Sequence, residues 1–238
     1  MNLSSAAYAD RLNVAVASNF AAPMEEIKKA FESGSNHELV IIRGSSGKHY
    51  AQIRNGAPFD VFLSADQARP LRLMEEGIAI PGTLGTYAMG RLALWSREED
   101  LELGKEYLLN TANYETLAIA NPRLAPYGQA ANEVLDAIGL EAGVNTRMVM
   151  GENIAQTFQF VYSGNADIGL VAYSQTLSPT VRGRGSSWLV PSELHQDIRQ
   201  DMVLLKDSLA AREFAAFMNS DAVRDIFISQ GYVLSDGR

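Results

Sequence analysis

Residues 12–31, LNVAVASNFAAPMEEIKKAF, set a pattern that recurs along the chain. The mostly apolar run at 12–17 predicts a buried strand, and Met24, Ile27 and Phe31 then recur at the spacing of one helix face. Between these elements, Ser18-Asn19 supplies residue types that favour the start of a helix. The stretch therefore predicts a strand, a polar turn and a helix, in that order.

Strands and helices are expected to alternate from this unit to the C-terminus. Strands are expected at residues 38–43, 60–64, 87–95, 116–120, 148–150, 166–171, 188–190 and 201–205. Helices are expected to begin near residues 47, 66, 127, 155, 209 and 222. This alternation predicts an α/β protein in which right-handed helical crossovers join mainly parallel strands.

A Pro/Gly-rich turn at residues 81–85 interrupts the alternation, which restarts after it. Two successive α/β blocks and a returning C-terminal tail predict two lobes, each a mainly parallel sheet flanked by helices. We expect 10–88 plus 201–238 to form one lobe and 89–200 the other, with hinges where the chain crosses near 87–90 and 198–202. A ligand of such sheets binds beyond the carboxyl ends of the strands, which here is the cleft between the lobes.

Composition excludes several classes of function. The net charge of −8 argues against a nucleic-acid partner, because phosphate backbones require clustered Lys and Arg. Cysteine is absent, which excludes disulfides and thiolate chemistry. No window approaches the roughly 18 to 20 unbroken apolar residues that cross a bilayer, so direct membrane insertion is not expected. The run at 4–9, SSAAYA, is compatible with the end of a truncated secretory signal or with an ordinary terminus.

Four of the strand-to-helix turns carry residues suited to an anion. They are Ser18-Asn19, Ser45-Ser46-Gly47, the turn at 121–128 (NPRLAPYG) and Glu152-Asn153-Ile154. Each offers backbone N–H groups that its helix does not use, and the helix dipoles favour an anion without any Lys or Arg. A lone serine in such a turn is usually an ordinary N-cap. The prediction of a site therefore depends on all four turns meeting at the cleft.

Catalytic and metal sites find little support in the sequence. Ser46 lies near His49, but no Gly-x-Ser-x-Gly elbow accompanies them. The glycine-rich turn at 44–48 lacks the spacing of a phosphate-binding P-loop. Asp60 and Asp66 are expected to cap structure. The three histidines have no metal-ligand spacing and are expected at the surface: His37, His49 and His195. We therefore predict no enzyme, no metal and no cofactor.

Taken in order, these turns and their neighbours resemble the periplasmic molybdate-binding proteins of ABC importers, which are two-lobed type II periplasmic binding proteins. The matching segments are ASNF at 17–20, GSSG at 44–47, NGAPFDVFLSAD at 55–66, ANP at 120–122, APYG at 125–128, GNADIG at 164–169 and GYVL at 231–234. Each segment alone is weak evidence, whereas the ordered set covers nearly the whole chain.

The resemblance implies a ligand, a set of binding residues and a partner. Its oxyanion ligands would be Ser18, Asn19, Ser46, Tyr127 and Ile154, the last two through backbone N–H groups. Some family members also place a tyrosine just after the strand expected here at 166–171. In this sequence that position holds Ala172, and Tyr173 is shifted by one residue, so Tyr173 is not assigned a role. The partner would be the membrane permease of the importer, and the protein would be a periplasmic monomer that binds molybdate, and tungstate comparably.

The predicted ligands also bear on which oxyanion binds. Molybdate, tungstate and sulfate are fully deprotonated near neutral pH, whereas phosphate keeps a proton that needs an acceptor. No Asp or Glu is among the predicted ligands, which disfavours phosphate. Sulfate would have to be excluded by cavity size. A binding protein for sulfate or phosphate, a sensory domain of the same fold, and a serine hydrolase built on Ser46 and His49 stay open as alternatives.

Overall fold

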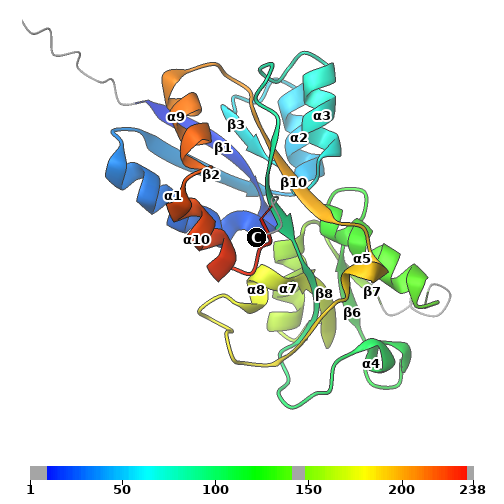
Figure 1. Ribbon diagram of the computed structural model, residues 1–238. Coiled ribbons are helices and arrows are strands. Elements are labelled where there is room, and N and C mark those ends of the chain that lie inside the picture. Colours follow the sequence, from blue (N-terminus) through cyan, green and yellow to red (C-terminus); the bar gives the residue numbers. More distant parts are fainter. Residues whose placement is uncertain (1–9, 141–147, 235–238) are drawn as a thin grey trace, which may run out of the picture.

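A computed structural model describes residues 10–140 and 148–234, which form two five-stranded sheets. The first sheet has the order β2 (Glu38–Gly44), β1 (Arg11–Ala17), β3 (Val61–Leu63), β10 (Ile198–Leu204) and β4 (Gly85–Gly90). The second has the order β7 (Met148–Gly151), β6 (Leu117–Ala120), β8 (Ile168–Ala172), β5 (Leu92–Ser96) and β9 (Ser186–Leu189). Figure 1 shows the first sheet and its helices above the second; we call them the first and second lobes.

Both sheets have the same pattern of strand directions. β2, β1 and β3 pair in parallel, and β10 runs antiparallel to both β3 and β4. In the second sheet β7, β6 and β8 pair in parallel, and β5 runs antiparallel to both β8 and β9. Only the fourth strand of each sheet is reversed, so the predicted two-lobed α/β fold with mainly parallel sheets is confirmed.

Helices cover both faces of the first sheet because its strands are apolar on both sides. In β3, Val61 and Leu63 join the core beneath α1 (Ala21–Gly34), α9 (Leu209–Phe217) and α10 (Asp221–Ser229). Figure 1 shows these three helices together on one side of the sheet. Phe62 points the other way, into the core beneath α2 (Ser46–Arg54) and α3 (Ala68–Glu75). The helix face predicted from Met24 and Ile27 lies in the first of these cores.

The second lobe repeats this arrangement. Leu117 and Ile119 of β6 pack in the core that includes α5 (Pro126–Ala137) and α4 (Lys105–Leu109), and Ala118 faces the core beneath α7 (Ile154–Tyr162). Three short segments complete the fold: η1 (Ser18–Phe20), α8 (Tyr173–Thr176) and η2 (Ser192–Leu194). Within 10–140 and 148–234, no helix combines the length and apolar character that crossing a membrane requires.

The prediction of one long strand at 87–95 is wrong. β4 ends at Gly90 in the first sheet, and β5 starts at Leu92 in the second, so the chain changes lobe at Arg91. It returns between Leu189 at the end of β9 and Ile198 at the start of β10. Apolar periodicity continues across Arg91 because both strands are buried, which hides the change of sheet in the sequence. α4 was not predicted either.

Candidate functional site

A small cavity lies between the two lobes, and all five predicted oxyanion ligands line it. Its lining is Ala17, Ser18, Asn19, Gly44, Ser45, Ser46, Ala65, Ala125, Pro126, Tyr127 and Ile154. The space inside it measures about 10 Å³, room for little more than one water-sized group. Pockets for organic ligands span roughly 300 to 1,000 Å³. The space therefore suits one small ion better than an organic molecule.

Ser46 contributes a hydroxyl that is not used for capping its helix. The N-cap of α2 is Ser45, whose side chain accepts the backbone N–H of Lys48. Ser46 is the first residue inside the helix and is 1% exposed. Its Oγ accepts the backbone N–H of Ala65 at 2.9 Å, which orients the hydroxyl while leaving its O–H free to donate.

Ser18 and Asn19 follow β1 and differ in how their side chains are used. Ser18 Oγ accepts the backbone N–H of Ala155 at 3.4 Å, so this hydroxyl contacts the second lobe directly. The Asn19 amide does not serve as a donor in the cavity, because Nδ2 donates to Gln200 Oε1 at 2.9 Å and to the Tyr232 hydroxyl at 3.1 Å. The Asn19 group left for an anion is its backbone N–H.

The second lobe contributes the first turns of α5 and α7. Tyr127 follows Pro126 at the start of α5, and Gly128 lets that turn approach β6: a Cβ there would lie 2.2 Å from the Ala120 oxygen. Ile154 begins α7, where the Asn153 side chain caps the helix by accepting the two N–H groups that follow Ile154. This cap leaves the Ile154 N–H directed outside the helix.

Several backbone donors around the cavity have no partner within the protein. In the described ranges, the backbone N–H groups of Ser46, Tyr127 and Ile154 meet no protein acceptor. Each residue is at most 2% exposed, and a buried N–H without a partner costs free energy. The N-termini of α2, α5 and α7 meet here, and no Lys, Arg, Asp or Glu among the described residues lines the cavity. Such a site favours an anion through oriented dipoles alone.

Direct contacts hold the lobes together around the cavity. The Gly47 N–H donates to the Leu124 oxygen at 2.9 Å, and a Cβ at Gly47 would come within 3.0 Å of Leu124, so the approach favours glycine. Nearby, Lys48 Nζ lies 2.7 Å from Glu152 Oε1, and both side chains are about half exposed. The lobes therefore enclose the cavity in this conformation.

A buried cluster of polar side chains lies behind the cavity and joins both lobes; we call it the inter-lobe cluster. It comprises Asn19, Tyr87, Tyr127, Ser174, Gln200 and Tyr232. Burial raises the pKa of Tyr232 to about 12 and the pKa of Tyr87 and Tyr127 well above 10.0, so the three hydroxyls stay protonated at neutral pH. No sequence pattern predicted this cluster. The one feature that could have indicated it is Gln200-Asp201, two polar residues within a buried strand.

The histidine prediction is wrong for two of three residues. His37 and His49 are buried, because each ring finds partners inside the first lobe. His37 Nδ1 accepts the Asp10 N–H, and the two His49 nitrogens lie 3.2 Å from the Val16 oxygen and from Gln52 Oε1. Burial also lowers the pKa of His49. A serine hydrolase would need His49 to pair with Ser46, but these contacts hold the His49 ring on other partners.

Asp66 and Tyr173 lie outside the lining of the cavity. Asp66 Oδ1 accepts the Arg69 N–H at 3.0 Å at the start of α3, in keeping with its expected structural role. Tyr173 stacks beneath the Arg91 guanidinium, 5.1 Å from ring centroid to Cζ. In the described part of the chain, no group of three or more His, Asp or Glu residues is arranged to hold a metal ion.

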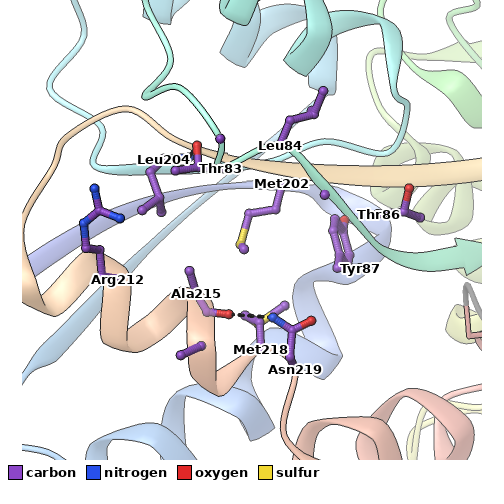
Figure 2. A pocket seen from close by; sticks show the side chains of 13 residues that line it. Thr83, Leu84, Thr86, Tyr87, Met202, Leu204, Arg212, Ala215, Met218 and Asn219 are labelled. Carbon is purple, nitrogen blue, oxygen red and sulfur yellow. Dashed lines mark hydrogen bonds between the residues drawn. The ribbon is translucent and has the colours of Figure 1, made fainter.

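A larger hollow lies on the first lobe, between α9 and strands β4 and β10 (Figure 2). It measures about 340 Å³ and is lined largely by apolar side chains such as Met202, Leu204 and Met218. Arg212 stands at its edge and binds the Asp207 carboxylate through Nε and Nη2, at 2.6 and 2.8 Å. The hollow lies within the first lobe, and none of the five predicted oxyanion ligands lines it.

Comparison with known proteins identifies the family of the chain. Residues 12–233 match the family of bacterial extracellular solute-binding proteins. The chain is 41% identical to the molybdate-binding protein of Azotobacter vinelandii, over 98% of this chain and 93% of that one. It is 42% identical to the Rhodobacter capsulatus molybdate-binding protein, over 98% and 92%. The solved Azotobacter vinelandii periplasmic molybdate-binding protein superposes with a TM-score of 0.89 and 36% identity, covering 94% and 99%.

Proposed function

The chain belongs to the bacterial extracellular solute-binding proteins, and we propose that it captures molybdate between its lobes for delivery to an ABC importer. The observation that carries this proposal is the cavity lined by uncharged donors from both lobes. Two relatives at 41% and 42% identity are molybdate-binding proteins, which supports the same ligand here. As in those relatives, the activity is binding rather than catalysis.

The proposed ligand set is Ser18, Asn19, Ser46, Tyr127 and Ile154. Ser18 and Ser46 would donate through their hydroxyls, and the other three through backbone N–H groups. An anion that bridges α2 of the first lobe and α5 and α7 of the second stabilises the enclosed conformation, because it contacts both lobes only when they meet. The lobes would separate about Arg91 and the 190–197 segment, where the chain changes sheet.

The donor-only lining favours molybdate and tungstate over phosphate. A protonated phosphate would place its O–H against donors, and the described part of the chain provides no carboxylate in the cavity lining to accept it. Sulfate is the second candidate, since it too is fully deprotonated and differs from molybdate mainly in size. A solved sulfate-binding protein of Mycobacterium tuberculosis superposes with a TM-score of 0.78, but at 14% identity this shows the fold alone.

The proposal also covers location and partners. We expect a periplasmic monomer that presents its enclosed, ligand-bound form to a membrane permease, since the solved Azotobacter vinelandii relative is a periplasmic protein. A sensory protein of the same fold would bind the same anion but act on another partner. Reconstitution with the membrane permease of a molybdate importer would separate these two roles: molybdate-dependent stimulation of transport supports delivery.

Isothermal titration calorimetry of the purified protein tests the ligand directly. Molybdate and tungstate should bind with one-to-one stoichiometry, and sulfate should bind more weakly. Phosphate should give no heat of binding at comparable concentrations. Tight phosphate binding without molybdate binding would reject the proposal, and sulfate binding in preference to molybdate would replace molybdate by sulfate.

A further inference from the structure

Gln200 occupies the centre of the inter-lobe cluster and is fully buried. It lies in β10, next to the register shift where β10 pairs with β4. Its Oε1 accepts from Asn19 Nδ2 at 2.9 Å and from the Tyr87 hydroxyl at 3.0 Å. Its Nε2 faces the Tyr127 hydroxyl at 3.5 Å. One side-chain amide thus contacts η1 and β4 of the first lobe and α5 of the second.

Two of these contacts join residues of the proposed anion site. Asn19 and Tyr127 both line the cavity, and they come from opposite lobes. Their backbone N–H groups are available to the anion, whereas their side chains point back to Gln200. Tyr232 and Ser174 complete the hold on Asn19, because their hydroxyls lie 2.9 and 3.3 Å from its backbone oxygen. The backbone position of Asn19 is therefore fixed from three elements.

The backbone of β4 packs closely against Gln200 and Tyr127. Gly90, at the end of β4, lies so close that a Cβ there would be 2.1 Å from the Tyr127 hydroxyl and 2.6 Å from Gln200 Nε2. The orientation of the amide follows from its partners. Asn19 Nδ2 is a donor and must face an oxygen, which leaves Nε2 for Tyr127.

We propose that Gln200 is a positioning residue of the oxyanion site: it holds Asn19 and Tyr127, one from each lobe, where their backbone N–H groups face the anion. This inference rests on the proposed function. Gln200 does not line the cavity, so it acts through the two residues that do. Precise placement of donors decides how strongly they bind, and groups that orient ligating residues often matter nearly as much as the ligands.

The first test measures molybdate affinity by calorimetry for the wild type, Gln200→Leu, Asn19→Ala and the double variant. Gln200→Leu should weaken binding by about 10- to 100-fold, the range for loss of an orienting group. Both changes free the backbone of Asn19 from the same constraint. The double variant should therefore bind molybdate at most about twofold less tightly than whichever single variant binds it less tightly. Gln230→Leu is the matched control: this buried glutamine donates to Glu26, outside the cluster, and its loss should leave affinity unchanged.

The second test uses Gln200→Glu and a pH profile. A protonated glutamic acid reproduces the amide, since its carbonyl accepts from Asn19 and its O–H can donate to Tyr127. A carboxylate cannot donate, and it adds negative charge near the anion. The titratable groups around it are the hydroxyls of Tyr87, Tyr127 and Tyr232, whose pKa burial raises. The carboxylates of Asp201 and Asp66 also act on Tyr87. The ratio of variant to wild-type affinity should therefore approach one at mildly acidic pH and fall as the pH rises. Taking the ratio at each pH removes the pH dependence of the wild type itself.

The outcomes separate this inference from the proposed function. If the wild type binds no molybdate, the proposed function fails. If the wild type binds and Gln200→Leu binds within about twofold of it, or if the two single losses multiply in the double variant, the positioning role is wrong. Should Gln200→Leu not fold, as judged by circular dichroism, the pH profile of Gln200→Glu decides: a profile parallel to the wild type overturns the inference.

Discussion

The cavity and the inter-lobe cluster are neighbouring polar regions with opposite hydrogen-bond status. In the cluster the polar side chains satisfy one another, as with Asn19 Nδ2, Gln200 Oε1 and the Tyr232 hydroxyl. Around the cavity, within the described residues, the backbone N–H groups of Ser46, Tyr127 and Ile154 have no protein acceptor. Since both regions are buried, solvent exposure does not explain the contrast. Unsatisfied donors mark where a ligand belongs, and satisfied ones mark what holds the site rigid.

The largest expected effect comes from placing a charged acceptor in the cavity, because it removes the difference between a site of free donors and a self-satisfied cluster. Ser46→Asp would place a carboxylate beside the bound anion, and two unit charges about 4 Å apart repel by roughly 4 kcal/mol at a protein-like dielectric. For a dianion we expect a loss of molybdate affinity of more than about a thousandfold. Calorimetry measures it. Ser208→Asp is the control: Ser208 caps α9 with its side chain, away from the cavity, and aspartate is an equally good N-cap, so affinity should not change.

Removing one donor without adding charge should have a smaller effect. Ser46→Ala deletes a hydroxyl from the cavity and leaves the Ala65 N–H without its partner. We expect molybdate binding to weaken by roughly 1 to 3 kcal/mol, or about 5- to 150-fold. Unchanged affinity in the folded variant would remove Ser46 from the ligand set.

The inter-lobe cluster, by contrast, should affect the free energy of unfolding at alkaline pH. Burial raises the pKa of Tyr232 from 10.0 to about 12, so the folded protein holds this proton more tightly than the unfolded chain does. Its stabilising contribution is therefore complete below pH 10 and is lost as the pH rises through about 12. Urea unfolding at increasing pH should show the free energy of unfolding falling in that window. Tyr232→Phe should show a shallower fall there, and an equally steep fall would assign the loss to other groups.

The smallest effect is expected at the rim. Lys48 and Glu152 join the lobes, but both are about half exposed, and exposed ion pairs contribute roughly 0 to 1 kcal/mol. Lys48→Ala should weaken molybdate binding by less than about fivefold, and raising the salt concentration should remove the difference. A larger loss that persists at high salt would show that Lys48 contributes to the site by another route.

Much of the site could be predicted from the sequence because helix starts are local. The turns at Ser18, Ser46, Tyr127 and Ile154 were recognisable from residue types within a few positions, and all four lie at the cavity. Two local interpretations were incomplete. Sequence alone could not separate Ser45, which caps α2, from Ser46, which does not. It also assigned a single strand across Arg91, since burial on both sides continues through the change of sheet.

Local sequence patterns predicted most of the strands and helices and the four polar turns, and the family resemblance implied a ligand set without charged side chains. The elements and the turns follow from periodicity and capping preferences, which act over short stretches, whereas the ligand set follows from motifs matched in order to the family. The packing of the two lobes was needed to establish that Asn19 turns its amide to Gln200, 181 residues away, and that Lys48 meets Glu152, 104 residues away. Such pairings depend on how the two lobes pack against each other. A polar side chain bonds to the partners that lie near it in space, and a local sequence pattern contains no information about that proximity.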